Sequence, residues 1–271
     1  MLRLARSFPK VLEKVLIRNP RQGGKLMIVY GEQGSGKTTI LETIAWAVKL
    51  LYPEEIVMWR GQKSCMWADF LATDLPVRVI YSGPEPIFVD AWTGRPAKLD
   101  IELVGPISPS EMLDACDSDY VNVIYIYTEG PKGPIDFATK WLDLLRALEE
   151  QPHGWVSLLF DEVEDLAPAN PKGTLWSLVE EIAQTVKEFR KNWVSFYAAT
   201  QNYFDVDYRL RGKMQFRMYL KGAVAPPRSR VWQRAIDSLS LGEGWLEGGK
   251  YEFFVFAEFP HGPELKVLNY R

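Results

Sequence analysis

The sequence predicts an α/β fold in which helices cover both faces of a mostly parallel sheet. Short apolar runs bounded by glycine or proline recur along the chain, as strands buried on both faces do. Stretches with helical spacing of apolar residues alternate with these runs. Three of the runs end in polar residues, and the carboxyl ends of parallel strands meet at one edge of a sheet. We therefore expect a site at that edge.

The elements can be taken in chain order. Residues 25–30 are an apolar run that predicts a buried strand, and a helix should follow from Lys37 to about Leu51, ended by Pro53. Between residues 54 and 130 the pattern favours strands separated by Gly/Pro turns. Beyond them we expect helices over 135–150 and 174–190, and strands over 155–160, 193–199, 214–220 and 251–257.

Residues 31–38 match the phosphate-binding pattern G-x-x-x-x-G-K-[ST] in full, between the first strand and the first helix. Glycines let backbone N–H groups turn toward phosphate oxygens, Lys37 reaches the β and γ phosphates, and the Thr38 hydroxyl ligates Mg²⁺. ATP and Mg²⁺ are the expected cofactors. The residues predicted to bind the nucleotide are Gly31, Glu32, Gln33, Gly34, Ser35, Gly36, Lys37, Thr38 and Thr39.

The strand over 155–160 is followed by two adjacent carboxylates, Asp161 and Glu162. At the carboxyl end of a neighbouring parallel strand, Asp161 would face the phosphate loop and hold Mg²⁺ through water. Glu162 would then polarise the attacking water as general base. Glu164 and Asp165 are nearby acids that we assign to a loop or a helix start.

The strand over 193–199 ends in the polar pair Thr200 and Gln201. A glutamine at this edge can hydrogen-bond the γ-phosphate and the water, and so report which nucleotide is bound. The other interpretation of Gln201 is that it caps the end of the strand.

These three strands, in this order and with the ending Ala-Thr-Gln, resemble the FtsK–HerA superfamily of DNA-pumping ATPases. The superfamily includes chromosome translocases, conjugation coupling proteins and viral genome-packaging ATPases. The resemblance implies a RecA-like P-loop NTPase sandwich and a ring, with a hexamer expected. It covers roughly residues 24–45 and 154–260.

The resemblance also implies that a basic residue before the sensor strand is an arginine finger, and Arg190 occupies that position. A finger supplied to a neighbouring subunit makes hydrolysis depend on assembly. Arg209, Arg211 and Arg217 are rivals for this role. The glycine turn over 241–244 and the following strand resemble the family's terminal pattern. The chain is too short for the N-terminal barrel of HerA and lacks the membrane spans of FtsK, which favours the minimal viral or plasmid members.

Composition excludes several classes of function. Two cysteines without metal-ligand spacing argue against a disulfide framework or a zinc site, and no apolar stretch predicts a membrane span. The expected location is the cytoplasm, or the host cytoplasm for a viral protein. A net charge of −3 argues against a chain coated in basic surface, although a ring motor can concentrate Lys and Arg in its channel.

The expected organisation is a basic N-terminal segment, residues 1–24, and an ATPase domain, residues 25–271, with a strand-rich insertion at about 54–130. The expected partners are double-stranded DNA, further copies of the chain and a viral or plasmid protein. Residues 167–173 and 60–63 are loops that could face a DNA channel or be ordinary turns. We assign no catalytic role to His153 or His261.

Two other functions fit parts of the sequence. An AAA+ remodelling or replication ATPase would need a helical lid after the sensor strand, where this sequence predicts strands. A nucleotide-dependent switch would bind partners and turn over slowly without moving a polymer. Stimulation of ATPase activity by DNA separates such a switch from a translocase.

Overall fold

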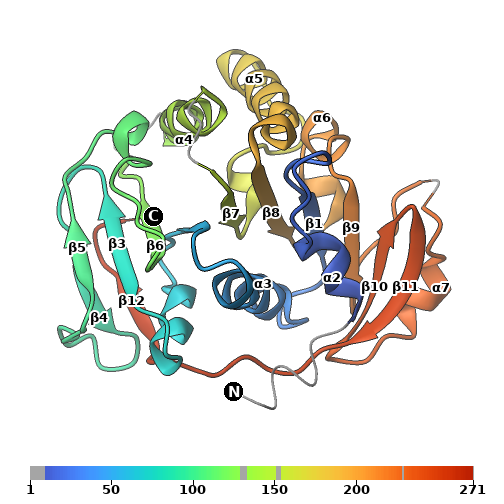
Figure 1. Cartoon of the computed structure of the whole chain (residues 1–271), viewed down its shortest axis with the longest axis horizontal. Coiled ribbons are helices and arrows are strands. Elements are labelled where there is room, and N and C mark those ends of the chain that lie inside the picture. The colour runs from blue at the N-terminus through green and yellow to red at the C-terminus, as the bar shows by residue number, and fades with distance from the viewer. Residues whose placement is uncertain (1–9, 129–132, 151–153, 228, 271) are drawn as a thin grey trace.

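Helices cover both faces of one large twisted sheet (Figure 1). The structure is a computed structural model that describes residues 10–128, 133–150, 154–227 and 229–270. The strand order in the sheet is β11-β10-β9-β1-β8-β7-β2-β6-β3-β5. All strand pairs in this sheet are parallel except those made by β10, which runs antiparallel to β9 and β11. The predicted α/β class with a mostly parallel sheet is confirmed.

The strands of the sheet follow the apolar runs of the sequence. Four strands are buried along their whole length: β1, β6, β7 and β8. Strand β2 is buried except at its first residue. Such burial is expected for strands that helices cover on both faces. The strands are β1 (Leu26–Tyr30), β2 (Ile56–Arg60), β3 (Val77–Tyr81), β5 (Glu102–Val104), β6 (Val121–Tyr125), β7 (Val156–Phe160), β8 (Val194–Thr200), β9 (Phe216–Leu220), β10 (Glu243–Gly248) and β11 (Lys250–Val255).

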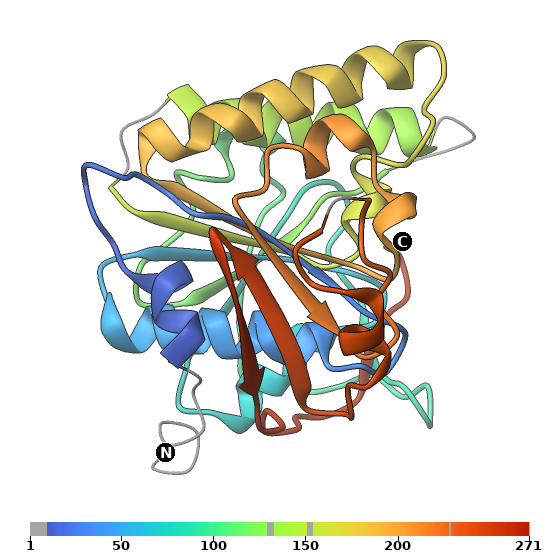
Figure 2. The same cartoon turned by 90° about the vertical axis from the view of Figure 1, so that its right-hand side faces the viewer.

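Two layers of helices enclose the sheet (Figure 2). Helices α2 (Lys10–Leu16) and α3 (Lys37–Leu51) lie on one face, and α4 (Gly133–Glu150) and α5 (Thr174–Glu188) lie on the other. The short helices are α6 (Tyr208–Arg211) and α7 (Gln233–Asp237), with 3-10 turns η1 (Met66–Ala72), η2 (Pro109–Glu111), η3 (Val163–Asp165), η4 (Phe189–Asn192) and η5 (Tyr203–Asp205). No helix in the described ranges is long and apolar enough to cross a bilayer.

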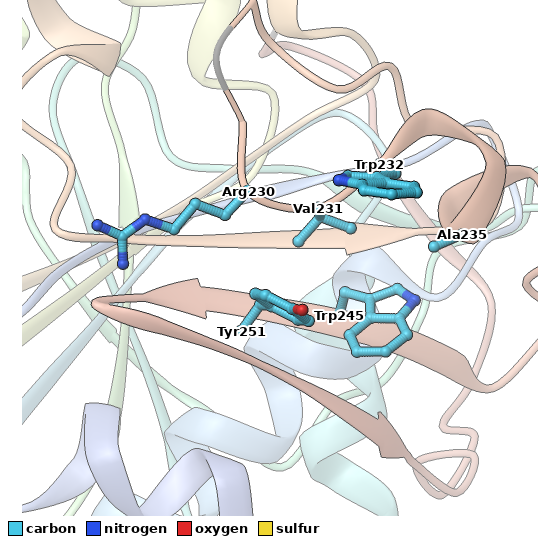
Figure 3. Close-up of a pocket in the computed structure, with 6 residues that line it drawn as sticks. All are labelled: Arg230, Val231, Trp232, Ala235, Trp245 and Tyr251. Atoms are coloured by element: carbon cyan, nitrogen blue, oxygen red, sulfur yellow. The ribbon is translucent and has the colours of Figure 1, made fainter.

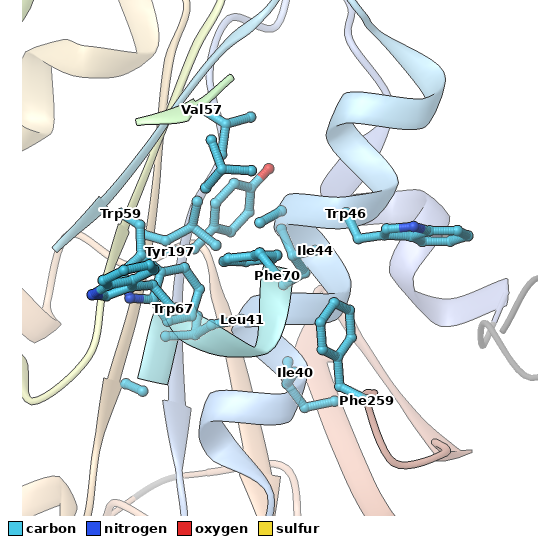
Figure 4. Packing of buried hydrophobic residues seen from close by; sticks show 14 of the residues in the cluster. Ile40, Leu41, Ile44, Trp46, Val57, Trp59, Trp67, Phe70, Tyr197 and Phe259 are labelled. Atoms are coloured by element: carbon cyan, nitrogen blue, oxygen red, sulfur yellow. The ribbon is translucent and has the colours of Figure 1, made fainter. Parts of the chain in front are cut away.

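Helix α3 is buried on almost every side. Its inner face packs on β2, β7 and β8, and its outer face is covered by α2, η1 and the C-terminal segment (Figure 4). The rings of Phe70 in η1 and Phe259 in the C-terminal segment lie 5.6 Å apart and close this layer. Because α3 follows the phosphate loop directly, this packing fixes the position of the loop.

The C-terminal segment crosses the molecule from β11 to the opposite end of the sheet (Figure 1). There, β12 (Leu265–Val267) pairs antiparallel with β4 (Phe88–Asp90) in a second, two-stranded sheet. The buried Tyr270 anchors the segment, because its hydroxyl donates hydrogen bonds to the carbonyls of Ser82 and Pro84, at 2.6 and 2.7 Å.

Most element positions agree with the sequence, and the expected neighbours β1, β8 and β7 are adjacent and parallel. The expected glycine turn is present at Leu241 and Gly242, where Gly242 has a φ of 82°, and β10 begins directly after it. Gly244 lies inside β10, where it pairs with Leu220 and Phe254. A Cβ at Gly244 would lie 2.4 Å from the Phe254 ring, so close packing, rather than a turn, requires glycine here.

The strand-rich stretch 54–130 supplies β2, β3, β5 and β6 to the main sheet. Helix α2, from the basic N-terminal segment, is packed into the hydrophobic core. Residues 1–9 of that segment lie outside the described residues. The proposed boundaries at residues 24 and 25 stay a prediction.

Candidate nucleotide-binding site

The phosphate loop connects β1 to α3 at the carboxyl edge of the sheet. Gly34 and Gly36 have φ angles of 75° and 93°, a left-handed backbone that side chains disfavour. A Cβ at Gly36 would also lie 2.7 Å from the ring of Phe256. The sequence needs glycine at these positions for the loop to turn its N–H groups inward.

Lys37 is the first residue of α3, and its ammonium group bends back over the loop. Nζ donates hydrogen bonds to the carbonyl oxygens of Gly31 and Glu32, at 3.0 and 2.9 Å. Burial lowers the pKa of Lys37, while Asp161 and neighbouring carboxylates act in the opposite direction. The cation is therefore held where phosphate oxygens would meet it.

Thr38 and Asp161 approach each other from α3 and the end of β7. Thr38 Oγ1 donates to Asp161 Oδ2 at 2.8 Å, and Asp161 Oδ1 accepts the backbone N–H of Glu162 at 2.9 Å. A hydroxyl and a carboxylate at this separation are the hard oxygen donors that Mg²⁺ prefers. The residues present fit the magnesium ion that the phosphate motif implies.

Glu162 directly follows Asp161 and has a left-handed backbone, with φ 53° and ψ 55°. Its Oε2 accepts a hydrogen bond from Gln62 Nε2 at 2.9 Å. Burial raises the pKa of Glu162, and the Arg60 guanidinium opposes this rise. Such a strained non-glycine conformation at a site is a common way to aim a reactive side chain.

Arg60, at the end of β2, holds the backbone of both acids. Nη1 donates to the carbonyl oxygens of Asp161 at 2.6 Å and Glu162 at 3.0 Å, and Nη2 pairs with Asp165. The guanidinium also lies over the ring of Phe160, 4.7 Å from its centroid. No sequence motif indicated this role of Arg60, although an arginine at the end of the apolar strand Ile-Val-Met-Trp was the available signal.

Gln62 is fixed by a network that no sequence pattern indicated. Its carbonyl oxygen accepts the Tyr125 hydroxyl at 3.0 Å, and that hydroxyl also accepts the Trp67 indole N–H at 2.9 Å. The next residues pair with β12, since Cys65 N–H donates to the carbonyl of Leu265 at 3.2 Å. Residues 60–63, suggested as a DNA loop, thus place Arg60 and Gln62 in the buried site and leave only Lys63 exposed.

Gln201 follows β8 at the same edge of the sheet as Lys37 and Asp161. It lines, with the predicted loop residues and acids, one cavity of about 370 Å³. The cavity is lined by Gln33, Gly34, Gly36, Lys37, Thr38, Thr39, Gln62, Ser64, Met66, Asp161, Glu162, Thr200 and Gln201. The remaining residues of the predicted set, Gly31, Glu32 and Ser35, belong to the loop but not to the lining of this cavity.

Glu164 lies in η3, outside the lining of this cavity. Burial raises the pKa of Glu164 to about 7, and its Oε2 has no hydrogen-bond partner in the described part of the chain. A carboxyl group poised near neutrality is suited to proton transfer. Glu164, two residues after Glu162, is therefore the first alternative to Glu162 as general base.

Arg190 lies at the opposite edge of the sheet. It belongs to η4, between α5 and the start of β8, and its carbonyl accepts the N–H of Gly24, just before β1. The other arginines considered as fingers make contacts within the chain. Arg209 pairs with Asp207, and Arg217 lies 3.7 Å from Glu247. Arg211 donates to the carbonyl of Tyr203.

The remaining candidates lie outside the cavity. Lys172 and Gly173 of the loop over 167–173 are exposed. His261 is exposed, with Nδ1 3.7 Å from an Asp69 carboxylate oxygen, and has no place in the cavity. His153 lies outside the described residues.

Comparison with solved structures shows which proteins share this fold. The chain is similar to the genome packaging NTPase B204 from Sulfolobus turreted icosahedral virus 2 in complex with ATP-gammaS, with a TM-score of 0.53 and 11% identity, covering 88% of this chain and 99% of that chain. It is also similar to the bacterial conjugative coupling protein TrwB, with a TM-score of 0.60 and 12% identity, covering 93% and 92%. No family model and no curated protein matches the sequence. The fold implied by the sequence resemblance is thus confirmed.

The contact between Gln62 and Glu162 leads to a first prediction. In Gln62→Leu, kcat for ATP should fall by about tenfold with little change in KM, because the carboxylate loses the donor that orients it. Loss of that donor should also raise the pKa of Glu162, so the acid limb of the pH profile should move to higher pH. Steady-state rates across pH measure both effects.

Ser64→Ala is the matched control, because Ser64 lines the same cavity and, within the described part of the chain, the hydrogen bond to the Glu162 carboxylate comes from Gln62 and not from Ser64. Its pH profile should overlay that of the wild type. A Gln62→Leu enzyme with an unchanged acid limb would show that Gln62 does not act through Glu162.

Proposed function

We propose that this protein is a magnesium-dependent ATPase that moves double-stranded DNA, in a packaging or transfer system of viral or plasmid type. The observation that carries the proposal is the single cavity that brings together Lys37, Thr38, Asp161, Glu162 and Gln201. Each of these residues is the type that phosphoryl transfer requires at its position. Support for the DNA role comes from the shared fold with a genome packaging NTPase and a conjugative coupling protein.

The chain's own residues divide the work of hydrolysis. The loop N–H groups and Lys37 hold the phosphates, and Thr38 and Asp161 hold the magnesium ion. Magnesium supplies neutralisation of charge on the β and γ oxygens when bound. Glu162, oriented by Gln62, accepts the proton of the attacking water, while Gln201 orients that water from the neighbouring strand.

The proposal includes a ring of copies, with a hexamer expected, and a viral or plasmid protein that recruits the DNA. We place it in the cytoplasm, or the host cytoplasm for a viral protein. The AAA+ alternative lacks its helical lid here, since after β8 the described helices are only α6 and α7, of four and five residues. A nucleotide-dependent switch would use the same cavity, and stimulation of ATP hydrolysis by DNA distinguishes a translocase from it.

The decisive measurement is the rate of ATP hydrolysis with and without double-stranded DNA, beside the mass of the particle in solution. A translocase should hydrolyse ATP several-fold faster with duplex DNA and should form particles larger than one chain. An ATPase rate that duplex DNA leaves unchanged, in assembled particles, would favour the switch.

A further inference from the structure

Charge is strongly segregated along this sequence. Between Tyr208 and Ile236 there are many basic residues and no Asp or Glu. Between Leu99 and Pro131 the reverse holds, with acids and no Lys or Arg. The basic residues of the first stretch are Arg209, Arg211, Lys213, Arg217, Lys221, Arg228, Arg230 and Arg234. The acids of the second are Asp100, Glu102, Glu111, Asp114, Asp117, Asp119 and Glu129.

The fold carries these two stretches to opposite ends of the sheet. The first supplies β9, which β10 separates from the edge strand β11, and α7. The second supplies the other edge strand, β5, and β6 (Figure 1). The nucleotide cavity lies between them, at the ends of β1, β7 and β8. The β10–β11 hairpin adds Glu243, Glu247 and Glu252 to the first end, so its basic character is confined to the exposed cations at that end.

We use the name basic end for the surface formed by Arg230, Arg234 and Lys250. All three side chains are exposed, and none forms an ion pair within the described residues. Arg230 and Lys250 are neighbours, because an Arg230 guanidinium N–H donates to the carbonyl of Gly249. Cations that are not neutralised by their own chain are available to an anionic partner.

Aromatic rings lie among these cations. Trp232 is 77% exposed and Tyr251 54% exposed, and both line a groove of about 230 Å³ between α7 and the β10–β11 hairpin. In Figure 3 Trp232 lies above Trp245 and Tyr251, and the Arg230 side chain extends away to the left. Exposed rings beside unpaired cations indicate a surface that is available to a partner.

The acidic end has the opposite character. A wide depression of about 1100 Å³ is lined there by Asp74, Asp100 and Glu102, with Lys98 as the one cation of its lining. A polyphosphate would be repelled from this surface. The two ends therefore differ in the sign of the charge that they would accept.

We propose that the basic end is the surface along which the phosphate backbone of DNA lies, with the acidic end facing away from it. This inference rests on the proposed function and adds the place where the chain meets its polymer. Contacts through Arg and Lys to phosphates are independent of base sequence, as a motor that moves any DNA requires. A second copy of this chain is the competing occupant, because exposed rings also suit a subunit interface.

The test compares two double variants that remove the same charge from opposite ends. Arg230→Gln with Lys250→Gln alters the basic end, and Arg95→Gln with Lys98→Gln is the matched control, since both of its side chains are exposed near the acidic end. Binding of a fluorescent duplex is measured by anisotropy over a range of salt concentrations. Binding of an ATP analogue and the ATPase rate without DNA confirm that each variant is folded.

We expect the basic-end variant to bind duplex DNA at least about tenfold more weakly at low salt. The slope of log K against log salt should become shallower by about 2, because two phosphate contacts are lost at about 0.9 each. The control should bind as the wild type does, and ATPase activity without DNA should be unchanged in both.

Three outcomes would overturn the proposal, and they are distinguishable. If the wild type binds duplex DNA and the basic-end variant binds it equally well, the surface is wrong and the proposed function stands. If the variant loses particle mass but keeps DNA affinity, the basic end is an interface between copies. If the wild type binds no DNA, the proposed DNA function falls, and this surface with it.

Discussion

Glu162→Gln should stop ATP turnover while leaving ATP bound. The amide keeps the size of the side chain and its contact with Gln62, and removes only the group that accepts a proton from water. We expect the rate to fall by roughly a hundredfold or more, the scale of losing a general base. Single-turnover hydrolysis and equilibrium binding of ATP, measured on the same preparation, give the two quantities separately.

Lys37→Ala should behave in the opposite way. Lys37 contacts the loop carbonyls, where it would meet the phosphates of the nucleotide, and we assign it no role in taking a proton from water. Its loss should therefore weaken nucleotide binding itself. Together the two variants separate binding from chemistry within one cavity.

Glu164→Gln is the matched control, two residues away and outside the cavity lining. It should retain turnover within a few-fold of the wild type. Normal hydrolysis by Glu162→Gln would show that another group is the base. Glu164, whose pKa burial raises to about 7, would then be the first to examine.

The site residues that could be predicted from the sequence are those that lie in one continuous segment or directly after a buried strand. Residues 31–39 lie in one strand–loop–helix unit, and Asp161 and Gln201 directly follow buried strands. In a parallel sheet those strand ends must meet at one edge, so local patterns were sufficient to place them. The roles of these residues in catalysis stay predictions.

The part that the sequence did not predict depends on contacts between distant segments. Arg60 reaches Glu162 across 102 positions, and Gln62 depends on Tyr125 and on pairing with β12 at the end of the chain. No spacing rule links such residues, because their proximity follows from strand order. Likewise Gly244 suggested a turn, and only its packing against Phe254 shows why glycine lies inside β10.

Arg190→Ala should abolish most hydrolysis in the assembled protein, by a factor on the order of 10³ if Arg190 acts as a finger on the next subunit. It cannot act on its own subunit's nucleotide. Arg190 precedes β8, whose seven residues separate it from Gln201, and at about 3.3 Å per residue this is roughly 20 Å. The side chain is exposed, as a contact with a neighbour requires.

The competing explanation is that Arg190 and Lys191 complement the negative end of helix α5, an effect of under about 1 kcal/mol with no role in catalysis. Mixing subunits decides between the two. Arg190→Ala subunits and Glu162→Gln subunits, each inactive alone, are combined. A finger in trans restores activity, because some interfaces then pair an intact Arg190 with an intact Glu162. If co-assembled mixtures remain inactive, Arg190 has a structural role, and the finger must come from another residue or be absent.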